Sequence, residues 1–146
     1  IKLIVSSIKR MPKFNYKLWK VGQEIEDNLK PKIDKFLDCD FKRNNDIFDV
    51  LDFHDEEKKI VVEVKGRSCP SDKWDDTIIT CGKITEGLMR VETGYDVYLF
   101  FVFTDKTLYL KLDPDNANFS MKYTGTNHIP HYLIPIKVLT EFEEED

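Results

Sequence analysis

Cysteine, histidine and glycine are scarce in this chain, and each scarcity argues against a class of protein. The 146 residues include three cysteines, three histidines and six glycines. The cysteines are odd in number and lack zinc-type spacing, so we expect a reduced, intracellular protein without a disulfide framework or a structural zinc site. The histidines also lack ligand spacing. No Gly-rich phosphate loop, dinucleotide fingerprint or Ser-His-Asp order occurs, and we therefore expect no small-molecule cofactor.

Long apolar runs are absent as well. No run reaches the length of a membrane span, so we expect no membrane association. The first ten residues are too short and too charged for a signal peptide, and Met11 resembles a natural start. We expect an N-terminal extension over 1–10, a single domain over 11–140 and an acidic tail over 141–146.

Charge is distributed unevenly along the chain, whose net charge is −5. Residues 1–43 contain eleven basic and six acidic residues, a net charge of +5. Residues 44–146 contain eleven basic and twenty-one acidic residues, a net charge of −10. The chain is therefore no general binder of nucleic acid, and any phosphate contact must come from a local basic patch.

Hydrophobic periodicity predicts an α/β fold whose elements run in the order helix, strands, helix, strands. An amphipathic helix is expected over 16–30 on Leu18, Val21, Ile25 and Leu29, and Pro31 either kinks it or opens a second helix to Leu37. A later helix is expected over 82–93. We expect strands near 46–53, 59–65, 95–104 and 107–112, a strand or short helix over 132–139, and loops over 67–81 and 113–128.

Two charged residues alternate with apolar ones in the strand near 59–65. Side chains alternate along a strand, so Glu63 and Lys65 share one face while Ile60, Val62 and Val64 share the other. A half-exposed strand with its polar residues facing water gives the same pattern. An aspartate on the preceding strand would instead complete a cluster of two carboxylates and one amine. Such a cluster suits Mg²⁺ or Mn²⁺ and is typical of a metal-dependent phosphodiester hydrolase.

The preceding strand offers two aspartates on opposite faces, Asp49 and Asp52. If the loop is His54–Lys58, Asp49 faces Glu63. If the turn tightens around Glu57–Lys58, Asp52 faces Glu63. The shorter spacing favours Asp52 by a small margin, and both assignments stay open.

These motifs resemble the PD-(D/E)XK nuclease superfamily. An aspartate precedes Glu-X-Lys on the next strand, and Glu26 follows Gly22 by four residues on the first helix, where the glycine would allow close approach to the sheet. The proline of the family name is replaced by Phe48 or Leu51. More narrowly, the chain is similar over most of 16–139 to small nuclease-like proteins of phages and large DNA viruses. The segments that carry this likeness are Phe-Asp-X-X-Asp-Phe-X-Asp, Glu-X-Lys-X-Arg, Gly82-Lys83-Ile84, Phe103-Thr104-Asp105 and His131-Tyr132-Leu133-Ile134-Pro135.

The resemblance implies a restriction-endonuclease-like core with a central mixed sheet. It further implies Mg²⁺-dependent (or Mn²⁺-dependent) cleavage of DNA in viral or phage DNA processing, within the cytoplasm or nucleus of a host. Glu63 and one aspartate, Asp52 or Asp49, would hold the metal ion, and Lys65 would position the attacking water or stabilise developing charge. Glu26 would hold a second ion or a water bound to it. DNA is the implied partner, and a homodimer is possible.

Three further residues are candidates for nucleic-acid contacts. Lys83 opens the second helix near the expected position of the scissile phosphate, and Arg67 follows the Glu-X-Lys strand. Trp74 lies in the loop over 67–81, where we expect it to pack on the domain rather than to stack on a base. A second function fits the same pattern, namely a catalytically inactive nuclease fold that serves as a nucleic-acid-binding or assembly subunit. The acidic net charge favours this alternative.

Overall fold

The computed structural model describes residues 15–44, 51–125 and 128–143. This part of the chain contains two α-helices, α2 (Tyr16–Leu37) and α3 (Cys81–Glu92), and two 3-10 helices, η1 (Pro114–Asn116) and η2 (Ile136–Val138). Its strands are β1 (Lys42–Arg43), β2 (Phe53–Asp55), β3 (Ile60–Gly66), β4 (Asp76–Thr80), β5 (Asp96–Val102), β6 (Thr107–Lys111), β7 (Ser120–Thr124), β8 (Ile129–Pro135) and β9 (Thr140–Glu141).

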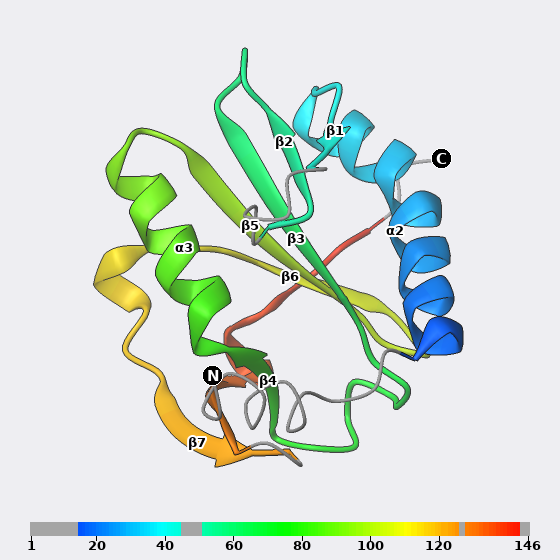
Figure 1. Cartoon of the computed structure of the whole chain (residues 1–146), viewed down its shortest axis with the longest axis vertical. Helices are drawn as coiled ribbons and strands as arrows, with labels where there is room; N and C mark the ends of the chain where they lie inside the picture. The colour runs from blue at the N-terminus through cyan, green and yellow to red at the C-terminus, as the bar shows by residue number, and fades with distance from the viewer. Residues whose placement is uncertain (1–14, 45–50, 126–127, 144–146) are drawn as a thin grey trace, which may run out of the picture.

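The strands form two sheets. The central sheet has the order β1-β2-β3-β5-β6-β9, and a smaller sheet has the order β4-β8-β7. Within the central sheet only β3 and β5 pair in parallel, because the chain between them passes through β4 and α3. Helices α2 and α3 lie on either side of this sheet (Figure 1). The expected mixed α/β fold with a mixed central sheet is therefore confirmed, while its assignment as a restriction-endonuclease-like core stays a prediction.

Each face of the central sheet belongs to a separate hydrophobic core. The α2 side is filled by Leu29, Ile33, Phe41, Phe53, Val62, Val64, Phe100 and Phe142. The α3 side is filled by Leu51, Val61, Ile79, Ile84, Val97, Leu99, Phe101, Phe103, Leu108, Leu112 and Ile134. The expected alternation in β3 is confirmed, since Val62 and Val64 pack toward α2. The aromatic run in β5 is core, buried on both faces as its continuous apolar character indicates.

Helix α2 is continuous through Pro31, so of the two predicted arrangements the single helix is observed. Asn15 caps its N-terminus, where the side-chain oxygen accepts a hydrogen bond from the Leu18 backbone N–H at 3.2 Å. The inward face of the helix is formed by Leu29 and Ile33 in its second half. The first two turns project beyond the core. Leu18 and Val21, which we expected to face inward, are consequently exposed.

The observed strands differ from the predicted ones mainly in the polar regions of the sequence. The predicted loop over 67–81 contains β4, and the predicted loop over 113–128 contains η1 and β7. Both expectations were wrong because these short strands gain their stability from pairing with β8, a contact distant in sequence. Of the predicted strand over 46–53, residues 46–50 lie outside the described part, and the observed strand β2 starts at Phe53 and runs on to Asp55. Residues 132–139 combine the end of β8 with η2.

The C-terminal segment is partly built into the fold. Glu141, which we expected in an acidic tail, belongs to β9, and Phe142 is buried against Phe36 and Phe100. The predicted N-terminal extension lies outside the described residues. In the described part of the chain no helix has both the length and the apolar character needed to cross a membrane.

The glycine that allows the first helix to approach the sheet is Gly66 rather than Gly22. A Cβ atom built at Gly22 would meet no atom within 4 Å, so the expected close contact there was wrong. A Cβ atom at Gly66, at the end of β3, would lie 2.5 Å from Cδ1 of Ile25 on α2. Helix α2 therefore contacts β3 closely at its end, and Gly22 instead leaves open space beside the helix.

Two of the helical glycines, Gly22 and Gly87, are expected to respond oppositely to alanine. Gly22→Ala should raise the free energy of unfolding by about 0.5–1 kcal/mol, because the new methyl group meets open space and alanine is the better helix former. Gly87→Ala in α3 should lower it by about 1–3 kcal/mol, since its Cβ would lie 2.7 Å from Leu112 Cδ2 and 3.4 Å from Val97 Cγ1. Urea denaturation of both variants measures these changes, and a stabilised Gly87→Ala would contradict the packing.

Candidate active site

The register of the β2–β3 hairpin places Asp52 beside Glu63. Phe53 pairs with Val62, and the same register continued by one residue sets Asp52 opposite Glu63. This is the arrangement expected for the tighter turn. The Asp52 carboxylate accepts a hydrogen bond from the Val64 backbone N–H at 2.8 Å, which ties it to β3. Asp49 lies outside the described residues.

Asn44, which follows β1, fixes the bend that carries Asp52. Its backbone N–H donates to the Asp52 carbonyl oxygen at 2.8 Å, and its side-chain amide donates to the Leu51 carbonyl oxygen at 2.8 Å. The amide oxygen of Asn44 also contacts Nδ1 of His54. Two hydrogen bonds from Asn44 thus hold the backbone at Leu51 and Asp52 and add to the strand register in fixing the position of the Asp52 carboxylate.

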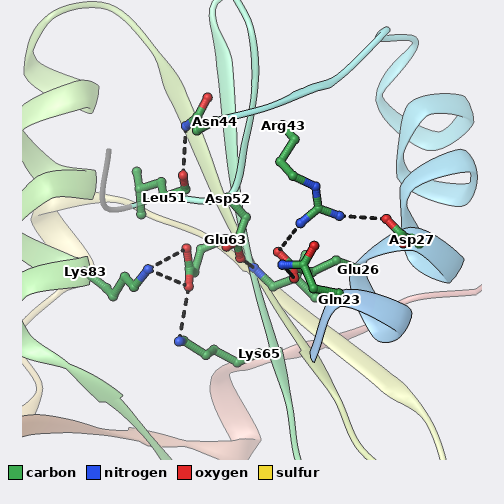
Figure 2. A network of polar contacts seen from close by, with 11 residues as sticks. Gln23, Glu26, Asp27, Arg43, Asn44, Leu51, Asp52, Glu63, Lys65 and Lys83 are labelled. Atoms are coloured by element: carbon green, nitrogen blue, oxygen red, sulfur yellow. Dashed lines mark hydrogen bonds and ion pairs between the residues drawn. The ribbon is translucent and has the colours of Figure 1, made fainter. Parts of the chain in front are cut away.

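Glu63 is buried at the centre of the sheet between two lysines (Figure 2). Only 1% of Glu63 is exposed. Lys83 Nζ on α3 lies 3.1 Å from Oε1 and donates a hydrogen bond to Oε2 at 3.3 Å, and Lys65 Nζ lies 3.4 Å from Oε1. Oε1 nevertheless accepts no hydrogen bond of acceptable geometry among the described residues. The alternative interpretation, in which the polar residues of this strand face water, is therefore wrong for Glu63.

Glu26 approaches the same place from α2. It is buried on the helix face that meets β3, where Gln23 Nε2 donates to Glu26 Oε2 at 3.3 Å. Arg43 NH1 lies 3.3 Å from Glu26 Oε1, and NH2 of the same side chain donates to Asp27 Oδ1 at 2.7 Å. Arg43 therefore holds α2 against the end of β1 through two carboxylates.

Glu26, Asp52 and Glu63 form what we call the carboxylate cluster, with Asp52 between the two glutamates in Figure 2. Burial and the neighbouring Asp52 carboxylate raise the pKa of Glu63 from its ordinary 4.5 to about 7, against the opposing effect of Lys83 and Lys65. Burial, the Asp52 charge and a hydrogen bond with Asp52 raise the pKa of Glu26 to about 7, against the effect of Arg43. Burial, and then the nearby Asp52 charge, therefore disfavour the ionised forms of both glutamates.

The cluster opens into a cleft of about 640 Å³. Its walls come from the first turns of α2, from Arg43 and Asn44, from Leu51 and Asp52, from the end of β3 and from Lys83. Glu26, Lys65 and Lys83, which the sequence nominated from three separate elements, are thus brought to one cavity.

Arg67 points elsewhere. Its guanidinium donates to Thr77 Oγ1 at 2.9 Å and to the Ile78 carbonyl oxygen, both on β4, and it lines a second cavity together with Trp74. These bonds connect the end of β3 to the smaller sheet. Trp74 is 64% exposed, so the expectation that it packs on the domain was wrong.

The carboxylate cluster has the donor chemistry that a hard divalent cation requires. Its donors are carboxylate oxygens, and the buried Oε1 of Glu63 lacks a hydrogen bond within the described residues. Across residues 15–44, 51–125 and 128–143, however, no three His, Cys, Asp or Glu side chains stand in an arrangement that could already hold a metal ion. The residues fit such an ion by chemical type and burial.

Sequence reasoning did not assign Arg43, Asn44 or Trp19 to the site. The sequence shows Arg43 as one of the basic residues of 1–43, but its contact with Glu26 depends on the β1–β2 register. No sequence pattern pointed to Asn44, because its role depends on the bend at Leu51 and Asp52, which its hydrogen bonds hold. Trp19 lines the cleft from an exposed helix turn that periodicity predicted to be buried in part.

An α/β domain with two carboxylates and a lysine on adjacent strand positions is consistent with a nuclease-like protein. The chain belongs to the family described as "Phage putative PDDEXK endonuclease", whose model matches residues 19–128. The match includes the carboxylate cluster and both lysines, and it confirms the resemblance seen in the sequence. The family indicates a nuclease function. No curated protein and no solved structure shows significant similarity to the chain.

The raised pKa values predict a pH-dependent stability without metal. Folded Glu63 and Glu26 keep their protons up to about pH 7, whereas the unfolded chain releases them near 4.5. The folded state binds more protons in between, so the free energy of unfolding in chelator should fall as pH rises from about 4.5 to 7, by on the order of 1–3 kcal/mol. Urea titrations across this range measure the fall.

Glu63→Gln should make that fall shallower, because an amide does not titrate. Glu24→Gln, an exposed position on the same helix as Glu26, is the matched control and should leave the slope unchanged. Identical slopes in wild type and Glu63→Gln would show that Glu63 does not carry the pH dependence.

Proposed function

We propose that the protein is a Mg²⁺- or Mn²⁺-dependent nuclease that hydrolyses DNA phosphodiester bonds, in phage or viral DNA processing. The observation that carries this proposal is the buried side chain of Glu63, which lies beside an aspartate and two lysines. One of its oxygens accepts no hydrogen bond from the described residues. A buried carboxylate costs folding free energy unless a partner compensates it. A structural role alone does not require a second and a third carboxylate at the same point.

Asp52 and Glu63 are the residues that would hold the cation, with Glu26 adjacent for a second ion or a water. A bound divalent cation would lower the pKa of a water molecule and polarise the phosphate. The protein contributes the fixed positions of the oxygens. Val64 N–H and Asn44 orient Asp52, and Gln23 and Arg43 orient Glu26. Asp49 remains a proposed neighbour of this group.

Lys65 is the proposed catalytic amine. It shares the face of β3 with Glu63, its Nζ lies 3.4 Å from Glu63 Oε1, and its side chain is one-third exposed toward the cleft. From that position the amine can orient an attacking water or donate to the phosphate oxygens as negative charge develops on them. The attraction between the Lys65 ammonium group and the reacting phosphate is stronger in a partly buried cleft than in water, because the effective dielectric constant is lower there.

Lys83 extends the positive wall of the cleft from α3. Its side chain is 20% exposed, and its Nζ contacts both oxygens of Glu63. We propose that it also attracts a DNA phosphate. The whole chain is acidic, so Lys65, Lys83 and Arg43 supply the local positive charge that the cleft needs for a polyanion.

One observation favours the alternative of a non-catalytic, nucleic-acid-binding or assembly subunit. Lys65 and Lys83 already compensate the charge of Glu63 without any metal ion. A cluster satisfied in this way can serve as a purely structural ion-pair network. The two functions differ in whether metal binds and whether DNA is cut.

Metal binding is tested by thermal melting. Mg²⁺ should raise the Tm of the wild type, because a ligand that binds only the folded state stabilises it by mass action. Asp52→Ala and Glu63→Ala should lose this rise, and Asp72→Ala, an exposed loop position, should keep it. A Tm that rises equally in Glu63→Ala would place the metal elsewhere.

Cleavage is tested on labelled single-stranded, duplex and branched DNA with Mg²⁺, Mn²⁺ or chelator. The wild type should cut only with metal, and Lys65→Ala should cut about 10²–10⁴-fold more slowly, the typical loss for a positioned catalytic group. Lys111→Ala, an exposed lysine paired with Asp96 on β5, should retain full activity. Folded wild-type protein that cuts none of these DNAs would instead support the non-catalytic function.

A further inference from the structure

The first two turns of α2 display a group of apolar side chains on the surface. Tyr16, Leu18, Trp19 and Val21 are all exposed, and Trp19 is 49% exposed. The rings of Tyr16 and Trp19 lie 5.7 Å apart between centroids with planes 32° apart. Leaving this much apolar ring area in water is unfavourable. The exposure of Trp19 therefore indicates a surface that binds something.

Trp19 is part of the same cavity as the proposed catalytic residues. The cleft that Asp52, Lys65 and Lys83 line is also lined by Leu18, Trp19 and Gly22. Because a Cβ atom at Gly22 would meet nothing within 4 Å, the helix surface one turn from Trp19 is open. The apolar wall formed by these α2 residues therefore faces the space that a DNA strand would occupy.

We propose that Trp19 stacks on an unpaired base of the strand bound in the cleft, so that the protein selects single-stranded DNA or DNA with unpaired nucleotides beside the cleavage site. This inference rests on the proposed function and names its substrate class. Inside a duplex both faces of each base are covered by neighbouring bases. Away from the duplex ends, only an unpaired or displaced base can offer a face to an indole, and such stacking tolerates any base sequence.

The charges around Trp19 favour a nucleic-acid strand over an apolar protein partner. Lys17 and Lys20 flank it on the exposed part of α2, and Lys65 stands in the same cleft. Aromatic side chains interleaved with lysines are typical of surfaces that follow a single strand, since the amines meet phosphates while the rings meet bases. Tyr16 packs against Trp19 and supports its ring.

Fluorescence tests the stacking directly. The chain has two tryptophans, so Trp74→Phe leaves Trp19 as the single reporter. In chelator, where no cleavage occurs, a single-stranded oligothymidylate should quench Trp19 emission, and a blunt duplex of the same length should quench it far less. Trp19→Leu should weaken single-strand binding by about 5- to 150-fold, the equivalent of one stacked base.

Two variants separate this role from general effects on the fold. Trp19→Phe should recover most of the single-strand affinity, because a phenyl ring can still stack. Trp74→Leu, which removes an exposed indole from the second cavity, should bind like the wild type. Under metal-dependent cleavage, Trp19→Leu should lose the preference for unpaired substrate more than it loses activity on duplex ends.

Three results would overturn the inference. One is an equal affinity of Trp19→Leu and wild type for single strands. Another is equal quenching by blunt duplex. The third is a wild-type dimer in sedimentation that Trp19→Leu converts to a monomer, which would assign the apolar surface to self-association. Since binding is measured without cleavage, failure of the stacking and failure of the nuclease function give separate outcomes.

Discussion

The burial of one ionisable side chain, Glu63, constrains the rest of the structure. It lies on β3 at the centre of the sheet with 1% of its surface exposed, where an unpaired charge would be strongly unfavourable. Lys83 reaches it from α3, Lys65 from its own strand and Asp52 from the adjacent bend. Each of these contacts requires a particular placement of a different element. The arrangement of β2, β3 and α3 is thus tied to the surroundings of a single carboxylate.

Much of this arrangement could be predicted from local pattern. The alternation of β3 placed Glu63 and Lys65 on one face, and the buried, aromatic β5 followed from its uninterrupted apolar run. The long first helix and α3 followed from their periodicity. The choice of Asp52 over Asp49 was narrow; the observed register sets Asp52 opposite Glu63, while Asp49 lies outside the described residues. These features share one property, which is that residues close in sequence determine them.

The features that could not be predicted depend on contacts distant in sequence. The segments of β4 and β7 were predicted as loops because their sequences carry little strand signal of their own. They form strands because they pair with β8. Periodicity predicted Leu18 and Val21 to be buried, yet α2 extends past the edge of the core. The roles of Asn44 and Arg43 arise from pairing of β1 with β2. Gly66, not Gly22, allows the close helix contact, since spacing along a helix does not show which neighbour it meets.

The cleft draws all of its described lining from residues 18–83. The chain after α3 nevertheless supplies most of the α3-side core and the opposite edge of the central sheet. The residues that line the cleft and most of the residues that pack the α3-side core are therefore in different parts of the sequence. Substitutions after α3 reach the cleft only through packing, which tolerates exchange among apolar residues of similar size. The later half of the molecule can accordingly acquire new surface specificities while the cleft is left intact, and a new recognition element can be added there without rebuilding the site.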